Sequence, residues 1–170
     1  PILRNSKKGI QYTVLDGPLQ ILNMAYPHPE FPKDGEMKED DISNELYGKE
    51  GLKRLMTYNE VRKNEFEYND SERIFAKENL NKYSGKLSVI MDHIEKSEGI
   101  VLIYSQYIDG GCIPIALALE EMGITRYGDK SSLFKTPPTE PLMIVGNKSE
   151  NDEEDTRYPA KYIMITGDPT

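Results

Sequence analysis

Residues 99 to 123, GIVLIYSQYIDGGCIPIALALEEMG, decide the fold that the sequence predicts. The run Ile100 to Tyr104 is apolar, rich in β-branched side chains and continuous rather than alternating, which indicates a strand buried on both faces. A helix is expected over residues 112 to 122, with Asp109 as its cap and Gly123 at its end. A strand, a glycine-containing loop and a helix in this order are typical of a ligand-facing edge in an α/β domain.

Composition and charge argue against several classes of function. The formal net charge of −8 at pH 7 disfavours a broadly basic, nucleic-acid-coating surface, although a local phosphate site remains compatible with it. Cys112 is the single cysteine, so an intrachain disulfide cannot form and a reducing compartment is favoured. His28 and His93 are the only histidines, so we expect no zinc site built from this chain alone. No apolar run of about 18 residues is present, and we expect a soluble chain with no membrane partner.

The first 82 residues are predicted to form an extension of the main domain. Residues 10 to 26 are predicted to be extended, either as a hairpin turned by Asp16-Gly17-Pro18 or as a strand entering a sheet. The segment 27 to 41, PHPEFPKDGEMKEDD, is rich in proline and charge, which predicts a linker or surface loop.

Helices are expected in the remainder of this extension. The stretch from Ile42 to about Tyr58 predicts one helix weakened at Gly48 and Gly51, or two short helices joined by a turn. Residues 59 to 70 are polar and aromatic, and no element is predicted there. A short helix is predicted over residues 71 to 81.

The second half of the chain has the clearest pattern. A helix is predicted over residues 84 to 97, because Ser84 is a good cap and four apolar residues follow at helical spacing. Those residues are Leu87, Ile90, Met91 and Ile94. Strands are predicted at residues 124 to 127 and 160 to 166, so the order of elements implies a parallel sheet. Because no helix follows the last strand to cover its other face, we expect a fragment of a larger domain or protein.

The loop after the strand at 100 to 104 carries the candidate binding residues. Ser105, Gln106 and Tyr107 offer side-chain donors, while Gly110 and Gly111 allow close approach to free backbone N–H groups at a helix start. Such a combination suits a phosphate. The alternative is that the polar residues merely end the strand and the glycines merely turn the chain.

Other motifs do not support catalysis by this chain. The pairs Gly48-Lys49 and Gly85-Lys86 lack the earlier glycine and the following Ser or Thr of a P-loop. The acidic run Asp152 to Asp155 follows no apolar strand, so a solvated loop is favoured over a magnesium site. Cys112 is better explained as a small buried residue than as a nucleophile, and Asp168 as part of a structural turn.

Two segments resemble the second RecA-like lobe of superfamily 2 helicases. They are KYSGKLSVIMDHIEKSEGIVLIYSQYIDGGCIPIALALEEMGITRYG, residues 82 to 128, and AKYIMITGDPT, residues 160 to 170. The similarity is to the group in large double-stranded DNA viruses, which includes the poxvirus early-transcription-factor small subunit and helicase-like proteins of giant viruses. Chromatin-remodelling ATPases show the similar pair SGKL and LIFSQ, matched here by Ser84 to Leu87 and Leu102 to Gln106.

The resemblance implies an α/β fold, namely an incomplete RecA-like three-layer lobe with a parallel sheet over residues 83 to 170. Residues 1 to 82 would then be the inter-lobe extension with a hairpin and helices, because LNMAYPHPEF (22 to 31) and LYGKEGLKRLM (46 to 56) resemble the region between the two lobes.

The resemblance also implies a function. The strand that ends in Ser105-Gln106 matches helicase motif IV, so Ser105, Gln106, Tyr107, Gly110 and Gly111 are expected to contact the backbone of DNA or RNA. ATP and Mg²⁺ would be bound elsewhere in the parent protein, with the first RecA-like lobe as partner. This chain would hold no catalytic residue and no cofactor, because the P-loop, the acidic box and the arginine-bearing motif are absent.

The same resemblance implies a viral protein located in the host cytoplasm or in the virion, with the viral transcription machinery as a further partner. Two alternatives remain open at this point. One is a non-catalytic helicase-fold subunit or docking module of a viral transcription apparatus. The other is a small α/β domain that binds a phosphorylated ligand at the same glycine loop.

Overall fold

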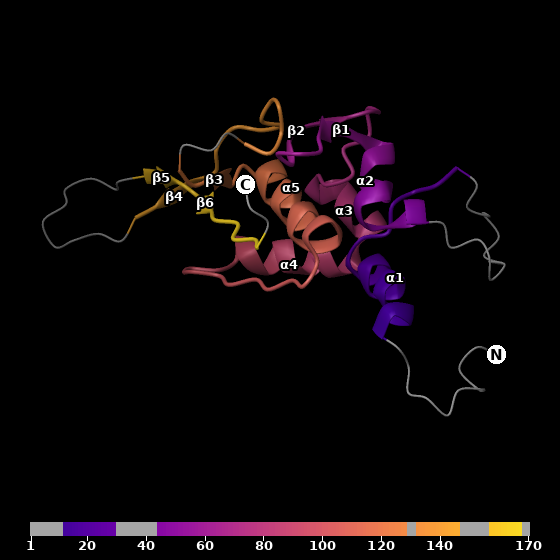
Figure 1. The fold of residues 1–170 in the computed structure, drawn as a ribbon. Coiled ribbons are helices and arrows are strands. Elements are labelled where there is room, and N and C mark those ends of the chain that lie inside the picture. Colours follow the sequence, from indigo (N-terminus) through magenta and orange to yellow (C-terminus); the bar gives the residue numbers. More distant parts are fainter. Residues whose placement is uncertain (1–11, 30–43, 129–131, 147–156, 168–170) are drawn as a thin grey trace, which may run out of the picture.

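A computed structural model of the chain combines helices with short parallel and antiparallel sheets (Figure 1). The structure describes residues 12–29, 44–128, 132–146 and 157–167. The α-helices are α1 (Tyr12–Asn23), α2 (Gly48–Leu55), α3 (Lys77–Tyr83), α4 (Gly85–Glu95) and α5 (Ile113–Glu121). The strands are β1 (Met56–Asn59), β2 (Asn64–Tyr68), β3 (Thr125–Arg126), β4 (Met143–Val145), β5 (Arg157–Pro159) and β6 (Lys161–Tyr162). A 3-10 turn at Asn44–Leu46 and a π-helical turn at Ile108–Cys112 add to these elements.

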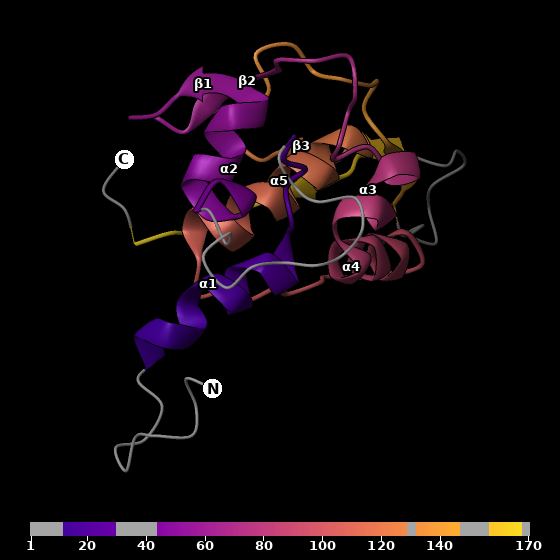
Figure 2. The ribbon, with the colours of Figure 1, turned by 90° about the vertical axis from the view of Figure 1, so that its right-hand side faces the viewer.

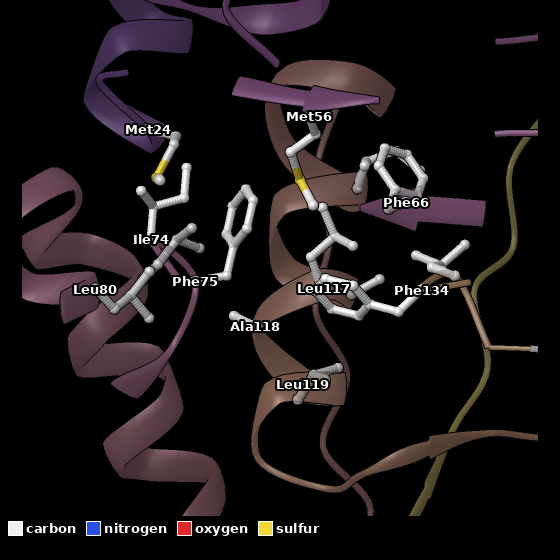
Figure 3. Close-up of a cluster of buried hydrophobic side chains, with 14 of the residues drawn as sticks. Met24, Met56, Phe66, Ile74, Phe75, Leu80, Leu117, Ala118, Leu119 and Phe134 are labelled. Carbon is white, nitrogen blue, oxygen red and sulfur yellow. The ribbon is translucent and has the colours of Figure 1, made fainter. Parts of the chain in front are cut away.

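Helix α5 is the centre of the hydrophobic core. In the view of Figure 2 it lies between α1 and α2 on one side and α3 and α4 on the other. Figure 3 shows Ile74, Phe75 and Leu80 on one side of α5, and Phe66 and Phe134 on the other. A helix packed on all sides must be apolar nearly all round, as the sequence of α5 is. The predicted helix at 112 to 122 is confirmed, as is its end at Gly123, whose φ is +81°.

Helix α4 also confirms its prediction. The Ser84 side chain caps it by accepting a 2.9 Å hydrogen bond from the N–H of Leu87. Leu87 and Met91 are buried, while Ile90 and Ile94 are partly buried against the same core. The short helix predicted at 71 to 81 is α3, which begins only at Lys77.

The prediction for residues 10 to 26 is wrong, because the described part of this stretch is helical from Tyr12 to Asn23. The Asp16-Gly17-Pro18 turn signal is overridden inside α1, where Gln20 Nε2 donates to Asp16 Oδ2 over 2.9 Å across one helical turn. After α1 the chain is held by backbone bonds from Ala25 N to Tyr83 O and from Tyr26 N to Leu46 O. Tertiary contacts thus fix this segment against its local turn propensity.

The stretch from residue 44 to residue 55 forms two short helical elements rather than one continuous helix, which is the second of the two predicted alternatives. The 3-10 turn at Asn44–Leu46 and helix α2 are separate, and the chain then leaves α2 at Met56 to form β1. An antiparallel hairpin of β1 and β2, with Met56 opposite Tyr68, was not predicted from residues 59 to 70. Phe66 of this hairpin is buried and forms an isolated parallel bridge with Phe134.

The predicted parallel sheet is present only in part. Strands β3 and β6 pair in parallel, with Thr125 opposite Lys161 and Arg126 opposite Tyr162. The strand predicted at 160 to 166 therefore pairs only at residues 161–162. An antiparallel pair of β4 and β5 was not predicted.

The prediction of a buried strand at Ile100 to Tyr104 is wrong. These residues form no strand, and Ile100, Leu102 and Tyr104 are 103%, 93% and 88% exposed. The residue types favour a strand, but a strand also needs a neighbouring strand, and that pairing is not encoded locally.

One hydrophobic cluster joins the two predicted parts of the chain, because it includes Met24 and Leu52 as well as Leu87 and Leu117. No described helix is long and apolar enough to cross a membrane. The acidic run Asp152–Asp155, Asp168 and most of the proline-rich segment 27 to 41 lie outside the described residues.

Candidate functional site

The predicted site residues lie at and just before the π-helical turn that leads into α5. This turn is closed by backbone bonds from Cys112 N to Tyr107 O, over 3.0 Å, and from Ile113 N to Ile108 O. Asp109 does not cap α5, contrary to the prediction. Its carboxylate lies 3.6 Å from Lys63 Nζ instead. Two backbone N–H groups at the start of α5, those of Cys112 and Ile113, therefore already donate to carbonyl oxygens of the turn.

Ser105 holds the start of this turn. Its hydroxyl donates to Tyr107 O over 3.1 Å and accepts from Tyr107 N over 3.2 Å. A Cβ added at Gly111 would lie 2.1 Å from Ser105 Oγ, so the serine is packed beneath the glycine. Ser105 and Gly111 thus meet one another and do not line the cavity described below.

Asn23 fixes the turn to two helices. Its side-chain amide donates to Gly110 O over 3.1 Å and accepts from Lys86 Nζ over 2.7 Å. The backbone oxygen of Asn23 accepts from Ser84 Oγ over 2.6 Å. The C-terminus of α1, the N-terminus of α4 and the π-helical turn are thereby held together.

An open cavity of about 540 Å³ lies beside the turn. Three predicted residues, Gln106, Tyr107 and Gly110, line it on one side. Gln20 of α1 lies between Gly110 and Gly48, since a Cβ at these glycines would be 2.3 and 2.6 Å from its Oε1 atom. The remaining lining residues are Ile108 and Asp109 of the turn, and Asn44, Tyr47, Gly48, Lys49 and Glu50 around the start of α2.

The start of α2, whose first residues line this cavity, has backbone donors without an acceptor among the described residues. Tyr47 occupies the N-cap position but makes no capping bond, and its hydroxyl donates to Asn44 Oδ1 over 2.8 Å. The N–H of Gly51 donates to Tyr47 O, whereas those of Gly48, Lys49 and Glu50 have no acceptor among the described residues. The positive end of the helix dipole lies at the same place.

The charged side chains at the cavity are engaged in ion pairs. Lys49 Nζ lies 3.1 Å from Glu60 Oε2, and Lys53 Nζ lies 2.9 Å from the same atom. Hydrogen bonds from Lys53 and then Lys49 lower the pKa of the Glu60 carboxyl, so Glu60 is held in its charged form. Because the lysine charge is offset in this way, backbone and amide donors are the groups most available to an anion.

The sequence did not point to the residues contributed by α1 and α2. Gln20, Asn44 and Tyr47 were assigned no function, and Gly48-Lys49 was considered only as a P-loop. One signal in the sequence could have indicated them. Tyr47, rather than Ser, Thr, Asp or Asn, precedes the helix that begins at Gly48, so the first N–H groups of that helix need another acceptor.

Metal and nucleophile chemistry find little support in the geometry. Within the described ranges, no group of three or more His, Cys, Asp or Glu side chains could hold a metal ion. Cys112 is half-buried, and this burial raises the pKa of its thiol, which favours the unreactive neutral form.

Comparison with known proteins adds no assignment: no family model, no curated protein and no solved structure matches this chain.

Proposed function

We propose that the cavity between the π-helical turn and the start of α2 binds the phosphate backbone of DNA or RNA. The observation that carries the proposal is that Gln106 and Tyr107 line the same cavity as Gly48, Lys49 and Glu50, whose N–H groups have no acceptor among the described residues. Backbone N–H groups at a helix start, together with the helix dipole, favour an anion such as a phosphate.

The proposed contact is local and independent of base sequence. A phosphate would accept hydrogen bonds from the start of α2, while the Gln106 amide supplies a further donor from the opposite wall. Contacts of this kind position a DNA or RNA strand without recognising its base sequence. A local contact is also compatible with a chain of net charge −8.

In the wider proposal, the chain is part of the second, RecA-like lobe of a superfamily 2 helicase or translocase of the large-DNA-virus type. ATP and Mg²⁺ act in the parent protein, where the first lobe is the partner, and this chain supplies the nucleic-acid contact rather than catalysis. The resemblance of Ser84 to Leu87 and Leu102 to Gln106 to the SGKL and motif IV segments supports this assignment. The host cytoplasm or the virion, near the viral transcription machinery, is the corresponding location.

The test is fluorescence-anisotropy titration of a labelled single-stranded oligonucleotide with the chain and its variants. Gln106→Ala is expected to weaken binding at least about tenfold, because one hydrogen bond to a charged group is lost. Asn81→Ala, an exposed amide on α3, is the matched control and should bind like the parent chain.

Two results would contradict the proposal. The first is no saturable binding of DNA or RNA by the parent chain, and the second is equal affinity for the Gln106→Ala and Asn81→Ala variants. Binding of a sugar phosphate that the oligonucleotide does not displace would favour a small phosphate-ligand domain instead.

A further inference from the structure

A second cavity, of about 380 Å³, lies beside strand β2 and takes no part in the proposed phosphate-backbone contact. Residues 66–68 of β2 and Phe134 line one part of it, and Arg73 and residues 136–138 line the rest. The cavity thus brings an arginine from the segment before α3 together with a threonine and two prolines from the segment before β4.

Arg73 brings a positive charge with an unused donor to this cavity. Its Nε and Nη2 atoms donate to the buried carboxylate of Glu121, and Nη2 also donates to Pro138 O over 3.3 Å. Its Nη1 atom makes no hydrogen bond with a described residue, and the side chain is 42% exposed. Arg73 can therefore donate to an anion in the cavity while it keeps its pair with Glu121.

Thr136 presents a hydroxyl beside this arginine. The residue is exposed, and neither its backbone nor its hydroxyl makes a hydrogen bond with another described residue. It lies two residues before Pro138, whose carbonyl oxygen Arg73 contacts, and two residues span at most about 7 Å of chain. A group added to the Thr136 hydroxyl is therefore within reach of the guanidinium.

The sequence around Thr136 is that of a phosphorylation substrate. Thr136 is the only serine or threonine of the 170 residues that a proline follows directly, and proline-directed protein kinases modify such pairs. Proline also favours an extended conformation of the residue before it, the form in which kinases bind their substrates. The backbone of residues 136–141 makes no backbone–backbone hydrogen bond with a described residue, so this segment can enter a kinase active site without losing one.

We propose that Thr136 is a phosphorylation site and that its phosphate binds Arg73. The phosphoryl group is supplied by ATP through a proline-directed kinase. The bond between Thr136 Oγ1 and the γ-phosphorus forms as the bond from that phosphorus to ADP breaks, and the hydroxyl proton is released. The product carries a charge of about −1.5 to −2 and three strong acceptor oxygens opposite the unused donor of Arg73.

The other charges at the cavity leave room for this contact. Glu67 lines the cavity and repels an anion, but its carboxylate is paired with Lys135 Nζ at 2.8 Å. These two side chains are 48% and 59% exposed, and an ion pair so open to solvent contributes little to stability. Lys135 adjoins Thr136 in sequence and is free to exchange Glu67 for the phosphate. Phosphorylation then ties the segment before β4 to Arg73 and, through Glu121, to α5.

The first test locates the phosphate. The full chain is incubated with ATP and a proline-directed kinase that phosphorylates the free peptide FKTPPTEP, residues 134 to 141, and mass spectrometry identifies the modified residue. We expect phosphate on Thr136 and none on this segment in the Thr136→Ala variant. Thr139→Ala is the matched control, because Thr139 is an exposed threonine of the same segment that Glu140 follows, and it should be modified like the parent chain.

The second test measures the contact with Arg73 by phosphorus NMR. The second pKa of the phosphate should lie about one unit lower in the folded chain than in the phosphorylated peptide, because the guanidinium favours the dianion. Arg73→Lys keeps a positive charge beside Glu121 but lacks the second terminal nitrogen, so it should reduce this difference. Arg62→Lys, at an exposed position in the β1–β2 turn, is the control and should leave it unchanged.

Three outcomes would overturn the proposal. One is a kinase that modifies the peptide but leaves Thr136 of the folded chain unmodified. Another is equal phosphate incorporation into this segment of the Thr136→Ala and Thr139→Ala variants. The last is a phosphate whose second pKa in the folded parent chain equals that in the peptide, since such a phosphate would not bind Arg73.

Discussion

Glu120, on the last turn of α5, is a buried carboxylate surrounded by neutral donors. It accepts hydrogen bonds from Ser132 Oγ, from the N–H groups of Leu133 and Phe134 over 2.8 and 3.1 Å, and from Tyr162 Oη over 2.7 Å. One side chain therefore joins α5 to the segment before β4 and to β6. Glu120 and its neighbour Glu121 form an acidic pair at the end of an apolar helix, and such a pair would ordinarily be expected to face solvent.

Replacing Glu120 should be strongly destabilising. Glu120→Ala leaves these donors without their acceptor inside the protein, so we expect the free energy of unfolding to fall by about 3 kcal/mol. Urea denaturation followed by circular dichroism measures the change. Glu98→Ala, an exposed glutamate outside the helices, is the control and should change stability by less than about 0.5 kcal/mol. A loss below about 1 kcal/mol for Glu120→Ala would contradict this role.

Tyr58 provides a pH-dependent prediction. Its ring stacks on Phe66 at 4.4 Å, and its buried hydroxyl has no hydrogen-bond partner among the described residues. Burial, and then the Asp109 carboxylate, raise the pKa of Tyr58 to about 12 from 10.0. The fold thus favours the neutral phenol, and this contribution to stability is present below pH 10 and is lost as the pH rises through 12.

Tyr58→Phe keeps the stacked ring and removes the unpartnered hydroxyl. At pH 7 we expect the variant to be as stable as the parent chain, or more stable by about 1 kcal/mol. Between pH 10 and 12 the variant should lose less stability than the parent chain. Urea unfolding at several pH values, with the exposed Tyr104→Phe as control, measures both effects. Identical pH profiles for parent and Tyr58→Phe would show that this hydroxyl does not titrate as argued.

At the scale of elements, the sequence predicted what local interactions determine. Helix α4 was predictable because Ser84 caps it directly and its buried residues recur at helical spacing. Helix α1 was not, because Asp16-Gly17-Pro18 is a strong local turn signal that packing overrides. The segment 100–104 has strand-forming residues, yet whether such a segment pairs depends on chain that lies far away in sequence, and no described strand pairs with it.

The sequence likewise pointed to only some of the residues at the candidate site. Gln106, Tyr107 and Gly110 line the cavity as a local loop motif predicts, whereas Ser105 and Gly111 are used to build the turn. The opposite wall comes from α1 and α2, whose approach depends on tertiary packing. Local sequence therefore located one wall of the cavity and could not supply the other.

The uncapped start of α2 gives a prediction for a whole helix. Tyr47→Asp places a capping carboxylate beside the N–H groups of Gly48, Lys49 and Glu50. The cap should add about 1 kcal/mol to helix stability, while it competes with a phosphate for the same donors and weakens oligonucleotide binding at least about tenfold. Urea unfolding and anisotropy titration measure the two effects separately.

Tyr47→Phe is the control for this change, because it removes only the hydroxyl that donates to Asn44. It should retain oligonucleotide affinity within about threefold. If Tyr47→Asp bound the oligonucleotide as tightly as Tyr47→Phe does, the start of α2 would not be the phosphate contact.

At the scale of the whole molecule, packing makes the described chain one unit. The core cluster takes Tyr26, Phe66 and Phe75 from the first 82 residues, and Met91 and Ile113 from the remainder. Aromatic contacts such as Tyr26 with Phe75 lie within the first part, but both parts bury their apolar side chains around α5. The phosphate cavity depends on this packing, because its two walls come from different parts of the chain.

The charge of the whole molecule limits how nucleic acid can bind. With a net charge of −8, and with Lys49, already paired with Glu60, as the cationic residue lining the described cavity, the chain is expected to neutralise at most one phosphate. For single-stranded nucleic acid, the logarithm of the binding constant should then fall with the logarithm of the salt concentration with a slope no steeper than about −0.7. Anisotropy titrations at several salt concentrations measure this slope. A slope steeper than about −4 would instead require a basic surface of about six cations in contact with the strand, and the contact would then lie elsewhere than in this cavity.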